Sequence, residues 1–273
     1  MAKAKQIEST STEIAVISPE EQAYLDSLRP AKASAPEGPA RLVINTDARN
    51  EDGKKLPIGA WHITGTDIYF DGEINFRPVR AINKLISYVE DDNGKWQMRG
   101  ESVYFTDYRE EILDSLGGIA LGRKFGSKLS DEEKEANKKL ASVYYDIFGF
   151  VDIGDGESRP VLFRTRGGKM YKMGKAFESV PKGKEYSQYN FKLETLQEGA
   201  AKYWTINVTP DLSKVLPISP ILAYDKEIGE YIKASNENVI RQFKQNAGRK
   251  VEDTLVEAST KHEIFTPDDD LPF

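Results

Sequence analysis

The sequence contains no cysteine and only two histidines among its 273 residues. The lack of cysteine excludes disulfide bonds, thiolate zinc sites and thiol nucleophiles, and it suits a reducing compartment. His62 and His262 are too few for a histidine-rich metal site or for most histidine-dependent triads. No apolar run reaches the length of a signal peptide or a membrane span. We therefore expect a soluble cytoplasmic protein with no membrane contact.

The motifs of nucleotide and metal chemistry are also missing. The glycine-rich pieces TRGGK (165–169) and SLGGIALGRKFG (115–126) lack the spacing of a P-loop or of GxGxxG. Carboxylates are plentiful, but a metal-dependent nuclease needs them clustered in space. We expect no catalytic residues, no metal and no cofactor, and hence a protein that is not an enzyme.

Charge is distributed unevenly along the chain. Residues 251–273 carry seven carboxylates and one lysine, a net charge of −6 that equals the charge of the whole chain. The remainder is neutral overall, but residues 158–184 hold eight basic residues against Glu178 alone. The sequence thus predicts a neutral body that contains one strongly basic stretch and is joined to an acidic tail.

Strand-like runs dominate residues 41–222, which we expect to form one β-rich domain with helical insertions. The runs are RLVIN (41–45), GAWHITGTDIYFDGEINFRPV (59–79), KLISYVE (84–90), KWQMRGESVYF (95–105), SVYYDIFGFVDI (142–153), PVLFRTR (160–166) and KYWTINVT (202–209). The pieces DDNGK (91–95) and DIGDGES (152–158) have the residues of hairpin turns.

Helices and flexible ends complete the expected organisation. Residues 1–40 read as a flexible segment with one short helix at 18–28, and residues 251–273 read as a disordered acidic tail. Inside the body we expect a helix over 107–116 that ends at two glycines. The capping box Ser130–Glu133 predicts a helix to about Ala141. Apolar spacing predicts another helix over 225–246, within a helical exit segment at 223–250.

The basic stretch favours single-stranded nucleic acid as a ligand. Arg164 and Arg166 alternate along a strand and share one face, and RGGKMYKMGK (166–175) reads as a flexible cationic loop beside it. Cations follow phosphates, and exposed rings stack on unpaired bases. Tyr171 is the best exposed aromatic candidate, whereas Trp61 and Trp204 read as core. The candidate DNA-binding residues are Arg159, Arg164, Arg166, Lys169, Tyr171, Lys172 and Lys175.

The last six residues are three aspartates followed by three apolar residues, whereas a tail that only keeps the protein soluble would stay polar to its end. They are Asp268, Asp269, Asp270, Leu271, Pro272 and Phe273. This end resembles the tip of bacterial and phage single-stranded DNA-binding proteins, which has several aspartates followed by Ile-Pro-Phe or another apolar, aromatic end. The stretches 63–80 and 161–175 are similar to a phage-type replication protein of this class, and unlike the shorter bacterial protein.

The resemblance implies an OB-fold, a five-stranded Greek-key barrel. It also implies sequence-tolerant binding of single-stranded DNA in replication, recombination and repair, in a bacterial or phage-infected cell. The tip would recruit a polymerase, helicase-primase, nuclease or recombinase by inserting its apolar end into a pocket. The sequence leaves open whether the protein forms a homo-oligomer.

Two other functions stay open from the residues alone. A regulator that binds duplex DNA would use a recognition helix within 236–250, where Arg241, Lys244, Arg249 and Lys250 lie. A carboxylate-metal nuclease would degrade DNA when a divalent ion is added.

The acidic tail is expected to compete with DNA for the cations of the body. Removing residues 268–273 should therefore tighten DNA binding at low salt, and the gain should shrink as salt screens the competition. The same truncation should abolish recruitment of replication proteins, whereas Phe273→Ala should impair recruitment alone. DNA titrations at two salt concentrations and a pull-down check this, and unchanged affinity after truncation would contradict the competition.

Overall fold

The computed structural model describes residues 5–6, 38–45, 56–90, 96–108, 111–126, 128–184, 187–198, 201–215 and 217–247. Its strands are β1 (Lys5–Gln6), β2 (Leu42–Ile44), β3 (Trp61–Ile63), β4 (Ile68–Phe70), β5 (Ile74–Glu90), β6 (Trp96–Glu101), β7 (Ser142–Gly154), β8 (Glu157–Thr165), β9 (Ser187–Glu198) and β10 (Ala201–Val215). Its helices are the short 3-10 helix η1 (Ala120–Gly122), α2 (Asp131–Leu140), α3 (Gly167–Glu178) and α4 (Ile218–Asn246).

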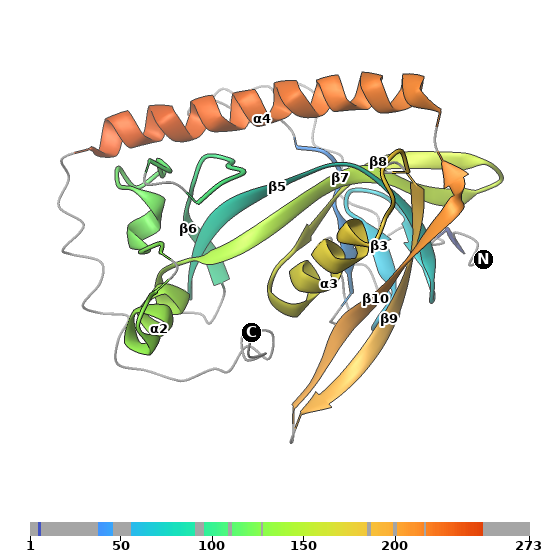
Figure 1. Ribbon diagram of the computed structural model, residues 1–273, viewed down its shortest axis with the longest axis horizontal. Helices are drawn as coiled ribbons and strands as arrows, with labels where there is room; N and C mark the ends of the chain where they lie inside the picture. Colours follow the sequence, from blue (N-terminus) through green and yellow to red (C-terminus); the bar gives the residue numbers. More distant parts are fainter. Residues whose placement is uncertain are drawn as a thin grey trace, which may run out of the picture.

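Two antiparallel sheets form the body (Figure 1). The smaller has the strand order β1-β4-β3-β2, and the larger has the order β10-β9-β5-β7-β8 with β6 paired to β5. A parallel bridge between Arg41 and Leu162 connects the start of β2 with β8. The predicted mainly β class with helical insertions is confirmed. The strands in the described ranges do not close into a barrel.

The central strand β5 is 17 residues long and bends where a proline interrupts it. The register with β7 shifts between Pro78 and Arg80, as expected because proline cannot donate a ladder hydrogen bond. Gly149 faces Pro78 across the ladder, and a Cβ there would collide with the carbonyl oxygen of Arg77 and the ring of Phe76. Glycine therefore lets the two strands approach closely at the bend.

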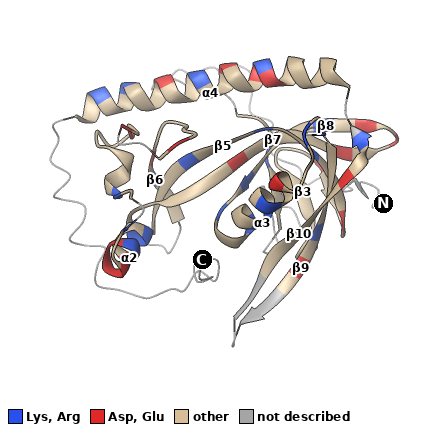
Figure 2. Cartoon of the chain, viewed as in Figure 1, with Lys and Arg blue, Asp and Glu red and all other residues tan. Residues whose placement is uncertain are grey.

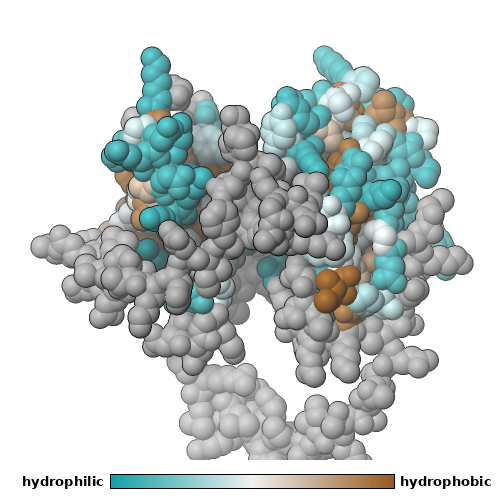
Figure 3. All heavy atoms as spheres, turned by 90° about the horizontal axis from the view of Figure 1, so that it is seen from below, coloured by the Kyte–Doolittle hydropathy of each residue, from teal (hydrophilic) through white to brown (hydrophobic). Residues whose placement is uncertain are grey.

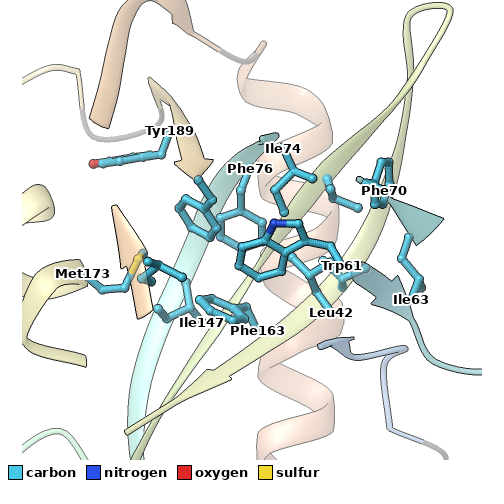
Figure 4. Close-up of a cluster of buried hydrophobic side chains, with 14 of the residues drawn as sticks. Leu42, Trp61, Ile63, Phe70, Ile74, Phe76, Ile147, Phe163, Met173 and Tyr189 are labelled. Atoms are coloured by element: carbon cyan, nitrogen blue, oxygen red, sulfur yellow. The ribbon is translucent and has the colours of Figure 1, made fainter. Parts of the chain in front are cut away.

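The main core lies between the two sheets and is rich in aromatic rings (Figure 4). Phe163 lies 5.6 Å from Trp61 and 5.4 Å from Phe191, measured between ring centroids. The indole nitrogen of Trp61 donates to the carbonyl oxygen of Gly72 at 3.1 Å, so the buried polar atom is satisfied. Trp61 is therefore a core residue, as predicted. Trp204 is half-buried against Gly59.

Helix α4 covers the other face of the larger sheet (Figure 1). Tyr224 and Ile228 of the helix pack with Phe148 and Leu162 of the sheet. Arg80 of β5 donates two hydrogen bonds to Asp225, each 2.7 Å long. The helix begins at Ile218, earlier than predicted, and it packs on the body instead of leaving it.

None of the helices in the described part of the chain has the length and apolar character that a membrane span requires.

The predicted helix at Ser130 is confirmed as α2. The Ser130 side chain accepts from the backbone N–H of Glu133, and the Glu133 carboxylate accepts from the backbone N–H of Ser130. Acidic residues occupy the first turn and lysines the last, in keeping with the helix dipole (Figure 2). The predicted β7–β8 turn is also confirmed, with Asp155 and Gly156 at positive φ.

The predicted helix over 107–116 is wrong. In its described part the chain turns around the buried side chain of Asp114. One carboxylate oxygen accepts the backbone N–H groups of Leu116 and Gly118, and the other accepts that of Leu121 at 2.6 Å. A carboxylate that binds nearby backbone donors competes with helical hydrogen bonds, and here it also holds Leu121 at a φ of 53°.

The Asp114 turn predicts a large stability effect. Asp114→Ala leaves three backbone donors without a charged acceptor, so the free energy of unfolding should fall by about 3 kcal/mol or more. The exposed neighbour Glu111 is the control, since Glu111→Ala should change it by less than about 0.5 kcal/mol. Urea denaturation measures both variants, and similar losses would contradict this role.

Candidate nucleic-acid interface

A surface groove lies where β5, β6 and β7 meet the end of α2. Its volume is 490 Å³. Aromatic and basic side chains dominate its lining, and we call the following six residues the aromatic groove: Tyr88, Trp96, Lys138, Lys139, Tyr144 and Arg166. They come from four separate elements and from the residue that follows β8.

The rings of the groove are brought together by strand register. The β5–β6 hairpin pairs Tyr88 with Met98 and Glu90 with Trp96, so Tyr88 and Trp96 lie on one face of the sheet. Tyr144 of β7 lies beside Tyr88, with ring centroids 6.3 Å apart. Tyr88 is 38% exposed and Trp96 is 57% exposed, although the described surface in Figure 3 is mainly hydrophilic. Exposed rings gathered in one groove are typical of binding surfaces.

Hydrogen bonds position the cations of the groove. Ser87 donates to the carbonyl oxygen of Leu140 at 2.6 Å, which fixes the end of α2 beside Tyr88. The exposed Lys138 and Lys139 are therefore held at the rim of the groove. Arg166 donates to the hydroxyl of Ser142, and its guanidinium lies 5.8 Å from the ring centroid of Tyr144. Rings flanked by cations can hold unpaired bases and their phosphates together.

Arg164 shares this face with Arg166, as predicted, but its charge is neutralised. Its guanidinium donates two hydrogen bonds of 2.6 Å to Asp146, whose side chain is fully buried. Tyr104 also donates to Asp146, and its own burial together with this carboxylate raises its pKa far above the usual range. Because the Arg164 guanidinium lies 5.7 Å from the Tyr144 ring centroid, the ion pair supports one wall of the groove.

Four of the predicted residues lie on α3, where the prediction of a flexible loop is wrong. The segment is helical because Met173 and Ala176 bury one side of it in the main core, and Phe177 contacts Tyr189. Tyr171 is 53% exposed, as predicted, and Lys175 lies 5.6 Å from its ring centroid. The other predicted residues on α3 are Lys169 and Lys172.

The structure therefore separates the predicted residues into three places. Helix α3 packs on the opposite face of the sheet from Arg164, since its partners Tyr145 and Phe163 alternate with Tyr144 and Arg164 along β7 and β8. Arg159 lies near the exposed β7–β8 turn. The predicted partner-binding residues Asp268–Phe273, the predicted short helix at 18–28 and the predicted acidic tail lie outside the described residues.

Sequence reasoning missed the groove residues other than Arg166. A signal existed, because the turn predicted at DDNGK (91–95), which lies outside the described residues, implies that the flanking strands with Tyr88 and Trp96 pair, as β5 and β6 do. Strand alternation also places Tyr144 on the same face of the sheet as Arg164. His62, for which no role was expected, is buried, and its Nε2 lies 3.1 Å from the carbonyl oxygen of Thr66.

The described residues give little support to the two alternative functions, a regulator that binds duplex DNA and a carboxylate-metal nuclease. No helix-turn-helix pair is present among them, because β9 and β10 separate α4 from the preceding helix α3. Within the same residues, no group of three or more histidine, aspartate or glutamate side chains is placed to hold a metal ion. Comparisons of the chain with protein-family models, curated proteins and solved structures found no match.

The two arginines on this face should differ sharply in their effect on stability. Arg164→Met leaves the Asp146 carboxylate buried without its cation, which should cost about 3–5 kcal/mol of unfolding free energy. Arg166→Met removes a hydrogen bond to a neutral hydroxyl and leaves no buried charge unpaired, so it should cost less than about 1 kcal/mol. Urea denaturation of the two variants is the measurement, and a similar small loss in both would show that the ion pair is not structural.

Proposed function

We propose that this protein binds single-stranded DNA, without strong sequence preference, through the aromatic groove. The observation that supports this most strongly is the placement of three rings between Lys138, Lys139 and Arg166. Ring faces accept any base, because every base has a π-face, and cations accept the phosphates between the bases. In duplex DNA the bases are already stacked and paired, so the rings would add nothing to duplex binding.

The wider role that we propose is protection of single strands during replication, recombination and repair. The acidic tip would recruit a polymerase, helicase-primase, nuclease or recombinase, and it would leave the basic surface when DNA binds. We also propose that the protein acts as a binding protein and not as an enzyme, in the cytoplasm of a bacterial or phage-infected cell. An OB-fold relationship is a further part of this proposal, supported by the antiparallel sheets that enclose one core.

Substitutions in the groove test the proposal directly. Trp96→Ala and Tyr144→Ala should each weaken oligo-dT binding by about 1–3 kcal/mol, with little dependence on salt, because each removes a stacking surface. Lys139→Ala should weaken binding to all sequences alike and should reduce the slope of log affinity against log salt by about 0.7. Fluorescence titrations at several salt concentrations measure both effects.

Tyr171 on α3 provides the matched control. It is almost as exposed as Trp96 and lies beside Lys175, but it is on the helix that covers the opposite face. If the strand follows the groove, Tyr171→Ala leaves the affinity unchanged. A loss for Tyr171→Ala without a loss for Trp96→Ala would place the strand on α3 instead.

The same titrations separate the alternative functions. Oligo-dT, oligo-dA and a duplex are compared with and without Mg²⁺, and both binding and strand integrity are followed. Equal affinity for the duplex would favour the regulator, and Mg²⁺-dependent cleavage would favour the nuclease.

A further inference from the structure

A second cavity, of 660 Å³, lies between helix α4 and the sheet. Lys84 and Arg164 line it from the sheet, Glu101 lines it from β6, and Tyr231, Ser235 and Asn238 line it from α4. The backbone segments 38–41 and 64–66 form part of its wall. Cavities of about 300–1,000 Å³ with a few convergent polar groups are typical of small-ligand sites.

Two cations of this cavity, Lys84 and Arg164, already have carboxylate partners, and the half-buried Arg41 also lines it. The ammonium of Lys84 lies 2.7 Å from Glu101 and donates to Ser235 at 3.1 Å, and Lys84 is only 2% exposed. Arg164 is held by Asp146 through two hydrogen bonds. An anion would have to compete with these carboxylates for the buried cations. The cavity therefore favours an uncharged ligand that carries both hydrogen-bond donors and acceptors.

The cavity and the aromatic groove adjoin each other. Arg164 lines the cavity, and its guanidinium lies against the ring of Tyr144, which lines the groove. Met98 lines the cavity and is paired across the β5–β6 ladder with Tyr88 of the groove. The charges differ between the two: the groove has Lys139 and Lys138 at its rim, the latter in an exposed pair with Glu135, whereas the cavity pairs the buried Lys84 with Glu101.

We propose that the cavity beneath α4 holds one unstacked base of a strand whose neighbouring nucleotides lie in the aromatic groove. A nucleobase is planar and uncharged and presents both donors and acceptors, which matches the part of the lining where Lys84 and Arg164 are paired with carboxylates. The hydroxyl of Tyr231 and the amide nitrogen of Asn238 are groups that can hydrogen-bond its edge, whereas the amide oxygen of Asn238 accepts from Arg241. This inference rests on the proposed function, since it assumes that the groove receives a single strand.

Titration of the full chain with thymidine tests the cavity separately from the groove. Thymidine lacks a phosphate, and amide chemical shifts in an NMR spectrum report where it binds. Thymidine should shift the signals of Lys84, Ser235 and Asn238 at both low and high salt, and inorganic phosphate should not. Shifts with phosphate alone, no shifts with thymidine, or thymidine shifts confined to Tyr88 and Trp96 would overturn the proposal.

A blocking variant and a matched control extend the test to the strand. Asn238→Trp fills the cavity from α4 and should abolish the thymidine shifts and lower oligo-dT affinity about fivefold or more. Glu237→Trp adds the same ring at the next position, which is exposed and does not line the cavity, and should change neither. If Asn238→Trp does not fold, the thymidine titration of the unmodified protein decides alone. Wild-type protein that fails to bind oligo-dT would refute the proposed function itself, whatever thymidine does.

Discussion

The ion pair between Arg164 and Asp146 organises the whole face of the sheet beneath α4. It lies in a low-dielectric layer where an unpaired charge would be very costly, and its two hydrogen bonds of 2.6 Å supply the compensation. Tyr104 adds a third hydrogen bond to the same carboxylate. This pair holds the sheet in a fixed arrangement with the segment that follows β6 and with the ring of Tyr144.

The pair also shows how a basic residue that stabilises the structure differs from one that can bind a phosphate. A cation that is already matched to a buried carboxylate supports the structure and is a poor partner for a phosphate. Lys139 and Arg166 lie at the groove without a buried carboxylate of this kind among the described contacts, so they are the cations that we propose as contacts of the DNA backbone. Positive charge in the sequence alone does not make this distinction.

Local signals in the sequence predicted the local structure well. The capping box at Ser130 and the turn at Asp155–Gly156 were predictable because each depends on residues that are adjacent in the chain. The prediction at 107–116 failed because Asp114 binds backbone donors up to seven residues away, which no helical pattern reveals. The segment 167–178 is helical because the core accepts Met173 and Ala176, so its tertiary contacts outweigh its three glycines.

The site could be predicted only in part, because it also depends on contacts between residues that are far apart in the chain. Strand alternation was sufficient to place Arg164 and Arg166 on one face. The partner of Arg164 depends on the register of β7 against β8, and the gathering of Tyr88, Trp96 and Tyr144 depends on the register of β5 against β6 and β7. Both are long-range properties, and neither follows from composition or spacing.

Photochemical cross-linking of oligo-dT to the full protein, followed by peptide mapping, tests the central claim most directly. The account predicts cross-links in the peptides that contain Tyr88, Trp96 and Tyr144, and their loss when unlabelled oligo-dT is added in excess. Cross-links confined to the peptide of Tyr171, or equal cross-linking to a duplex, would contradict the assignment of the aromatic groove as the site of single-stranded DNA.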